Sequence, residues 1–110
     1  MEDFQIIDNC LMVRMPEEVD HHRASYICEG ADRLLVRENV ENVVFDFEDT
    51  RFMDSSGIGI LLNRYKQMAA SRGTVTYYGA GPRILRILEM GGLGRLIRGF
   101  KDRESALGNL

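Results

Sequence analysis

The segment Phe52-Met53-Asp54-Ser55-Ser56-Gly57-Ile58-Gly59 joins a predicted strand to a predicted helix, and this junction decides the fold. Upstream, Val43-Val44-Phe45-Asp46-Phe47 is an apolar, β-branched and aromatic run, typical of a strand covered by helices. Downstream, apolar residues recur at a helical spacing that predicts one buried face: Ile58, Leu61, Leu62, Tyr65, Met68 and Ala69. The two serines therefore lie at a helix start, where free backbone N–H groups and the helix dipole favour a serine oxygen or a phosphate.

The first part of the chain predicts a hairpin and a helix. Residues 4–7 and 10–15 are apolar runs separated by Asp8-Asn9, a pair that tolerates the positive φ angles of a tight turn. Pro16-Glu17-Glu18 ends the second run, and Asp20 is a predicted helix cap. The apolar positions of that helix are Ala24, Ile27, Cys28, Ala31, Leu34 and Leu35.

After the serine junction the strand and helix patterns continue to alternate. Arg72-Gly73 ends the second helix, and residues 74–78 predict a strand. Gly79-Ala80-Gly81-Pro82 is a turn into a short helix that ends at Gly91-Gly92. A strand over residues 96–100 and a last helix capped by Asp102 complete the pattern. The sequence predicts an α/β fold, with one mixed five-stranded sheet and about four helices packed against it in a single domain of residues 1–110.

Composition limits where the protein acts. The apolar runs are too short to cross a membrane, and the start Met1-Glu2-Asp3 lacks the basic and apolar regions of a signal peptide, so a cytoplasmic protein is expected. Cys10 and Cys28 have no metal-ligand spacing and are both predicted to be buried apolar residues.

The net charge of −3 hides an asymmetry along the chain. Residues 1–54 carry 14 acids and 5 bases, whereas residues 55–110 carry 3 acids and 9 bases. Such a split can steer a protein partner, although solvated faces that offset each other after folding are the favoured interpretation. Nucleic-acid binding is not expected, because the pI is acidic and the bases are not interleaved with aromatic residues.

The serine pair has two interpretations from composition alone. A serine hydroxyl can cap the helix by accepting a backbone N–H, which contributes about 1 kcal/mol, and this interpretation is the favoured one. However, Asp54, Ser55 and Ser56 compete for a position that needs one cap. Gly57 and Gly59 leave the first turn bare, so another protein can approach the backbone, unless the glycines relieve crowding against a strand.

Catalytic and metal sites are not predicted. The serine turn lacks the Gly-x-Ser-x-Gly pattern of a nucleophile elbow, and adjacent His21 and His22 do not share a helix face. These histidines are interpreted as part of a solvated first turn. The Gly79–Gly81 pair before a helix is weak evidence for phosphate binding.

The sequence resembles the STAS-domain anti-sigma factor antagonists, and within them the sporulation branch that acts on an anti-sigma F factor. The resemblance rests on Asp20-His21-His22, on Phe52-Met53-Asp54-Ser55-Ser56-Gly57-Ile58-Gly59, on Arg64-Tyr65-Lys66-Gln67 and on Met90-Gly91-Gly92-Leu93. These pieces occur in family order and cover nearly the whole chain. One departure is Glu17-Glu18-Val19-Asp20, where members often have Gly-Glu-Leu-Asp.

The resemblance implies a non-enzymatic switch without a cofactor. Ser55 would be phosphorylated by a nucleotide-bound partner that is both anti-sigma factor and serine kinase. The unmodified form would bind that kinase and release a sporulation-type sigma factor, and a phosphoserine phosphatase would restore it. The implied contact surface comprises Asp20, His21, Asp54, Ser56, Gly57, Ile58 and Gly59, on a chain that is monomeric when free.

Two rival functions remain open at this stage. One is a STAS scaffold subunit of a stress-signalling complex, which would act inside a large assembly. The other is a small-ligand or nucleotide-binding module that uses the turn at residues 79–82.

Overall fold

A mixed sheet forms the centre of the molecule. The computed structural model describes residues 3–110, apart from the side chain of Arg37; Met1-Glu2 of the charged start lie outside this range. The sheet order is β1-β2-β4-β6-β7. The strands are β1 (Phe4–Ile7), β2 (Cys10–Arg14), β4 (Asn42–Asp46), β6 (Thr74–Tyr78) and β7 (Arg98–Phe100). Only the β1–β2 pair is antiparallel, which confirms the predicted mixed five-stranded sheet.

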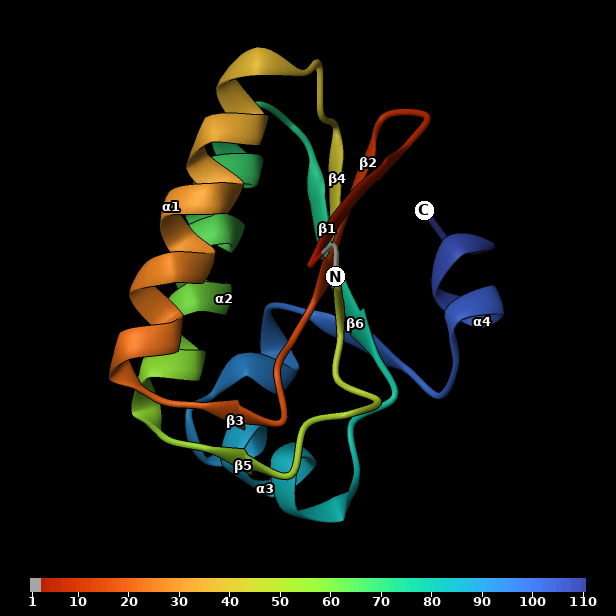
Figure 1. Cartoon of the computed structure of the whole chain (residues 1–110). Helices are drawn as coiled ribbons and strands as arrows, with labels where there is room; N and C mark the ends of the chain where they lie inside the picture. The colour runs from red at the N-terminus through yellow and green to blue at the C-terminus, as the bar shows by residue number, and fades with distance from the viewer. Residues whose placement is uncertain (1–2) are drawn as a thin grey trace.

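Helices cover the two faces of the sheet unequally (Figure 1). The long helices α1 (His21–Arg37) and α2 (Ser55–Ala70) lie side by side on one face. The short α4 (Arg103–Leu107) lies on the other face, and α3 (Pro82–Met90) lies near one end of the sheet. The large core cluster therefore lies under α1 and α2, and a smaller one lies under α4: Cys10, Met12, Val44, Tyr78 and Ala106.

The turn predicted at Asp8-Asn9, the predicted start and end signals of α3 and the predicted cap of α4 are confirmed. Asp8 has φ 53° in the hairpin, and Ile7 pairs with Cys10. Pro82 opens α3, Gly92 follows that helix with φ 78°, and the Asp102 side chain caps α4 by accepting the Ser105 N–H. At the end of α2, Arg72 and not Gly73 has the positive φ, of 62°. Gly73 is needed instead for its close approach to the Glu41 carbonyl.

Some local predictions were wrong, and the strand expected over residues 43–47 covers Asn42–Asp46 instead. The strand expected over residues 96–100 begins only at Arg98, because a 3-10 turn, η1 (Leu93–Arg95), precedes it. The strand expected over residues 10–15 ends at Arg14. Cys28 is only partly buried, because it packs against the margin of the main core cluster, whereas Cys10 is buried as predicted.

The buried face of α2 differs from the predicted one. Gly57, Ile60, Leu61, Arg64 and Met68 are buried, and Ala69 is exposed. The helix packs against the sheet, α1 and α3, so more than one side of it is covered. Arg64 is 4% exposed and its Nη1 donates to Asp32 Oδ1 of α1 at 2.5 Å. An apolar periodicity cannot show this charged contact between helices.

A second, two-stranded sheet was not predicted. It consists of β3 (Glu18–Val19) and β5 (Phe52–Met53), which pair in parallel. Glu18, interpreted from sequence as part of a break, is therefore extended. Two residues are too few for a periodic signal, and each strand depends on a partner that is distant in the chain.

Candidate functional site

The β3–β5 ribbon brings the starts of α1 and α2 together (Figure 1). Val19 and Met53 are register partners, and both are buried. The Asp54 N–H donates to the Val19 carbonyl at 3.1 Å. The next residues, Asp20 and Asp54, thus leave the ribbon side by side, although they are far apart in sequence. This junction contains the serine turn and is the candidate site.

Asp20 and Asp54 perform the same local task on neighbouring helices. Asp20 Oδ1 accepts the Arg23 N–H at 2.9 Å, and Asp54 Oδ1 accepts the Ser56 N–H at 2.8 Å. Each carboxylate satisfies one N–H that lacks an intrahelical acceptor, and its negative charge opposes the positive end of the helix dipole. The hydrogen bond from Arg23 is the main reason why the pKa of Asp20 is lowered.

The assignment of the α2 cap to a serine was wrong, because the side chain of Asp54 caps this helix. Ser55 is the first residue of α2 and is exposed. Within residues 3–110 its hydroxyl has no hydrogen-bond partner, whereas Ser56 is partly buried and held through its N–H. An exposed hydroxyl that is not used as a cap remains available for chemistry. This difference separates two serines that look alike in the sequence.

The two glycines of the turn have different roles. A Cβ at Gly57 would overlap the buried Met53 side chain, so this glycine relieves crowding against β5. A Cβ at Gly59 would meet nothing within 4 Å. The bare-turn interpretation therefore holds for Gly59, and the crowding interpretation holds for Gly57.

Apolar side chains border the serine turn. Ile58 is partly buried, and it packs so closely on Gly91 that a Cβ there would lie 2.7 Å from Ile58 Cδ1. Phe52 is 48% exposed in β5, and Met90 is 81% exposed at the end of α3, the helix that packs against β5. These last two residues are not among the contact residues expected from the sequence. The alternation of Phe52 outward and Met53 inward was the available signal.

His21 and His22 lie exposed in the first turn of α1, as predicted. Their ring centroids are 6.0 Å apart. His21 follows Asp20 directly, so it lies at the edge of the junction. Within residues 3–110 no group of three or more His, Cys, Asp or Glu side chains could hold a metal ion.

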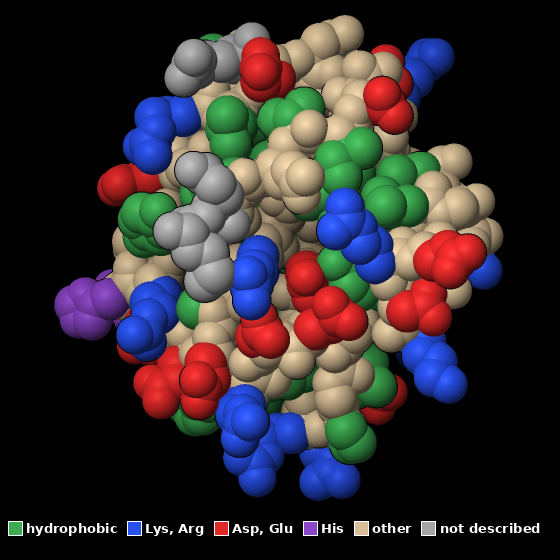
Figure 2. All heavy atoms as spheres, turned by 45° about the vertical axis from the view of Figure 1, so that its right-hand side comes forward, with side chains coloured by type: hydrophobic (Ala, Val, Ile, Leu, Met, Phe, Trp, Pro, Cys, Tyr) green, Lys and Arg blue, Asp and Glu red, His purple; other side chains and the backbone are tan. Residues whose placement is uncertain are grey.

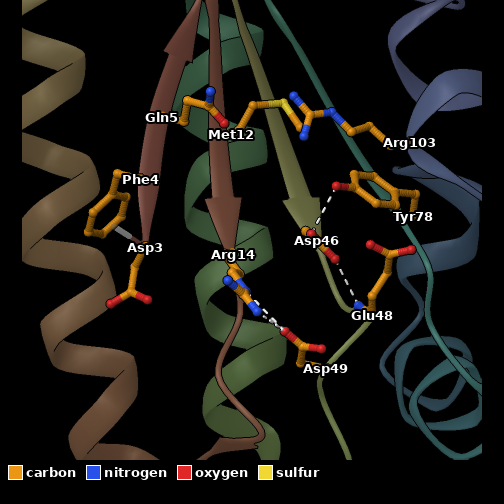
Figure 3. Close-up of a pocket in the computed structure, with 10 residues that line it drawn as sticks. All are labelled: Asp3, Phe4, Gln5, Met12, Arg14, Asp46, Glu48, Asp49, Tyr78 and Arg103. Carbon is orange, nitrogen blue, oxygen red and sulfur yellow. Dashed lines mark hydrogen bonds and ion pairs between the residues drawn. The ribbon is translucent and has the colours of Figure 1, made fainter. Parts of the chain in front are cut away.

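A polar hollow on the α4 side of the sheet is a separate feature (Figure 3). Some of its polar side chains are engaged with one another: Arg14 pairs with Asp49 at 2.5 Å, and Tyr78 Oη donates to Asp46 Oδ2 at 2.9 Å. Burial, together with that hydrogen bond, raises the pKa of Tyr78 above its ordinary value. We interpret this network as support for the strand ends.

The charge asymmetry of the chain is not cancelled by ion pairs between its halves. Among residues 3–110, only the Arg64–Asp32 pair joins the two halves. The other ion pairs lie within the first half. Acidic and basic side chains are nevertheless interspersed on the face shown in Figure 2. The ribbon end carries three acidic residues, Glu18, Asp20 and Asp54. Arg23 Nη1 lies 3.6 Å from a carboxylate oxygen of Glu18 and 3.6 Å from one of Asp20.

The turn over residues 79–82 offers poor support for phosphate binding. Gly79 has φ 76°, and a Cβ there would lie 2.5 Å from Glu48 Cγ. The side chain of an acid therefore packs against the turn that precedes α3, which disfavours an anion.

In the described part of the chain, no helix is both long and apolar enough to cross a bilayer.

Comparisons with known proteins identify relatives of this chain in sequence and in fold. The STAS domain model matches residues 3–106. A Paenibacillus polymyxa anti-sigma F factor antagonist is 32% identical over 100 residues, covering 91% of this chain and 86% of that protein. The structure of the anti-sigma factor antagonist SpoIIAA in its unphosphorylated form superposes with a TM-score of 0.86 at 24% identity, covering 96% of this chain and 92% of that one.

A second solved structure concerns the modified state of such a protein. The Bacillus cell fate determinant SpoIIAA in the phosphorylated form has a TM-score of 0.75 at 26% identity, covering 96% of this chain and 97% of that one. The likeness to the unphosphorylated structure shows the fold. The family model and the 32% identical relative show more: this chain belongs to the STAS domain family and, within it, to the anti-sigma factor antagonists.

Proposed function

We propose that the unphosphorylated chain binds an anti-sigma factor that is also a serine kinase, and thereby releases a sporulation-type sigma factor. Phosphorylation of Ser55 ends this complex, and a phosphoserine phosphatase restores the active form. The observation that carries the proposal is the Ser55 hydroxyl, exposed and free of hydrogen bonds to described residues at the first position of α2, while Asp54 supplies the cap. A named relative and a phosphorylated neighbour support it.

The proposed contact surface combines the acidic ribbon end with its apolar border. It comprises Asp20, His21, Asp54, Ser56, Gly57, Ile58 and Gly59, to which we add Phe52 and Met90. The exposed Phe52 and Met90 side chains supply the apolar anchors that concentrate binding energy in interfaces. Asp20 and Asp54 favour a partner surface that is basic. The open backbone around Gly59 lets an active site reach Ser55.

Phosphorylation acts in this proposal through charge. A phosphate adds about −1.5 to −2 charges beside Asp54, in a surface presented to the nucleotide site of the kinase. That site already holds phosphates, so the added charge is buried without a partner. A penalty of about 2–5 kcal/mol weakens binding by roughly 30-fold or more. The chemistry belongs to the kinase, and the chain itself acts in the cytoplasm as a monomeric single domain without a cofactor.

The deciding experiment compares affinities for the nucleotide-bound cognate kinase. Ser55→Ala removes only a hydroxyl, so binding is retained and inactivation is lost. Ser55→Asp is expected to bind at least about tenfold more weakly, because one carboxylate imitates a phosphate incompletely. Ser71→Asp adds the same charge at the exposed C-terminal end of α2 and serves as the matched control. Equal affinities for wild type, Ser55→Ala and Ser55→Asp would contradict the mechanism.

A second measurement identifies the modified hydroxyl. After incubation with the kinase and ATP, fragment-ion mass spectrometry is expected to place the phosphate on Ser55. Ser56 is partly buried, and its N–H is bound to Asp54, so it is less accessible. A phosphate found only on Ser56 would exclude the assignment.

A further inference from the structure

An open cavity of about 270 Å³ lies at the outer edge of the sheet, away from the serine turn. Its walls come from α2, β6, β7, the loop before each of these strands and the end of the chain. The lining residues are Tyr65, Gly73, Thr74, Val75, Thr76, Leu96, Arg98, Phe100 and Asn109. Tyr65 lies ten positions after Ser55 on α2, which corresponds to about 15 Å along a helix. The cavity is therefore distinct from the proposed contact surface.

The cavity exists because β7 is shorter than β6. Thr76, Tyr77 and Tyr78 pair with Arg98, Gly99 and Phe100. The first two residues of β6, Thr74 and Val75, have no β7 partner. Leu96 stands beyond the end of β7 and is 44% exposed. The sheet edge is thus left open beside an apolar wall.

A buried hydroxyl in this cavity has no partner. Thr76 is 6% exposed, and within residues 3–110 its Oγ1 makes no hydrogen bond. Buried hydroxyls are normally satisfied, because losing water without a replacement costs free energy. Thr76 and Tyr78 are two positions apart on β6, so both side chains point to the sheet face that α4 covers. Thr76 belongs to the cavity lining, and a molecule bound there would supply the partner that this buried hydroxyl lacks.

The charge of the lining indicates the sign of that molecule. Arg98 is the only ionised residue among the lining residues. Its guanidinium lies 4.9 Å from the centroid of the Phe100 ring, and among residues 3–110 it pairs with no carboxylate. Stacking on an aromatic ring leaves the N–H edge of a guanidinium free for a planar anion. The other polar side chains of the lining are neutral.

We propose that this cavity binds a small amphipathic carboxylate. The carboxylate accepts hydrogen bonds from Arg98 and from the Thr76 hydroxyl, and an aromatic or branched apolar body packs against Leu96, Val75 and Tyr65. The volume is close to the lower end of the range for ligand pockets, which suits a molecule of about 10–15 non-hydrogen atoms. This ligand site is additional to the proposed partner switch and does not depend on it.

The test uses 2-naphthoate as the probe and the neutral alcohol 2-naphthalenemethanol as its matched control. In ¹H–¹⁵N spectra of the full chain, 2-naphthoate is expected to shift the amides of Thr76, Leu96 and Arg98 in a saturable manner. A dissociation constant on the order of 1 mM is expected for a ligand of this size. The alcohol should bind at least about tenfold more weakly, because it lacks the charge that Arg98 recognises.

Variants separate the recognition of charge from nonspecific adsorption. Arg98→Gln should weaken 2-naphthoate binding about tenfold, whereas Arg95→Gln, an exposed arginine outside the lining, should leave it unchanged. Thr76→Val keeps the shape and removes the unpaired hydroxyl, so it should weaken binding several-fold while the chain stays at least as stable. Absence of saturation up to about 10 mM probe, equal binding of the alcohol or equal effects of the two arginine variants would each overturn the proposal.

Discussion

The N–H of Asp54 donates to the carbonyl of Val19 at 3.1 Å, and this bond links the starts of two helices that are separated by two strands, β4 and β5, in the sequence. Because α1 and α2 start from one ribbon, their first turns and their capping carboxylates form one surface. Ser55, the proposed phosphorylation site, therefore lies on a base that both helices share. Single substitutions at and around this junction should therefore change the free energy of unfolding by amounts that depend on the contact removed.

Phosphorylation of Ser55 should leave the fold intact. A phosphate at an exposed helix start interacts favourably with the dipole, by about 0.3–1 kcal/mol, although Asp54 opposes part of this gain. Thermal unfolding followed by circular dichroism should give midpoints for the two forms that agree within a few degrees. A fall of about 10 °C or more would contradict the geometry described for Ser55.

The glycines of the serine turn should respond in opposite directions to alanine. Gly57→Ala forces a methyl group into the buried Met53 side chain and should lower the free energy of unfolding by about 1–3 kcal/mol. Gly59→Ala meets no atom within 4 Å and should raise it by about 0.5–1 kcal/mol. Urea unfolding of the two variants measures the difference. Similar effects of both substitutions would mean that Gly57 is not packed against β5 as described.

The two partners of the Arg64–Asp32 pair should differ in how much their substitution lowers the free energy of unfolding. Asp32→Ala leaves the Arg64 guanidinium buried without its carboxylate and should cost about 1–3 kcal/mol, moderated by the exposure of Asp32. Arg64→Met replaces the charged group by an apolar side chain of similar length and should cost less. Chemical denaturation of both single variants checks the order. A more destabilising Arg64→Met would show that this contact is a net source of stability.

Acid should weaken the cap of α1. The pKa of Asp20 is lowered in the folded chain, chiefly by the N–H of Arg23, from an ordinary value of 3.8. A carboxyl whose pKa is lower in the folded than in the unfolded chain stabilises the fold at pH values above the unfolded pKa. This contribution is lost as the pH falls through the folded pKa. Asp20→Asn keeps a capping oxygen but does not titrate. Between pH 6 and pH 3 the stability of wild type should therefore fall more than that of Asp20→Asn, as measured by urea unfolding.

Much of the architecture was predictable because its signals are local. The hairpin at Asp8-Asn9, the Asp20 and Asp102 caps and the proline at the start of α3 each depend on a few neighbouring residues, and the structure confirms them. The five apolar runs predicted the mixed sheet for the same reason. The serine motif also identified the position of the candidate site, since a strand that leads into a helix is visible in a short window.

The sequence by itself determined the order of the main elements and the family, whereas only the tertiary structure decided which atoms at the junction are free. β3 and β5 pair although they are distant in the chain, and each strand has only two residues, which is too short for a periodic pattern in the sequence. That pairing positions the backbone of Asp54, whose side chain caps α2 by accepting the Ser56 N–H. Ser55 is therefore left exposed. The burial of Arg64 and the separate roles of Gly57 and Gly59 likewise depend on neighbours from other elements, because packing in three dimensions determines which side of a helix is covered.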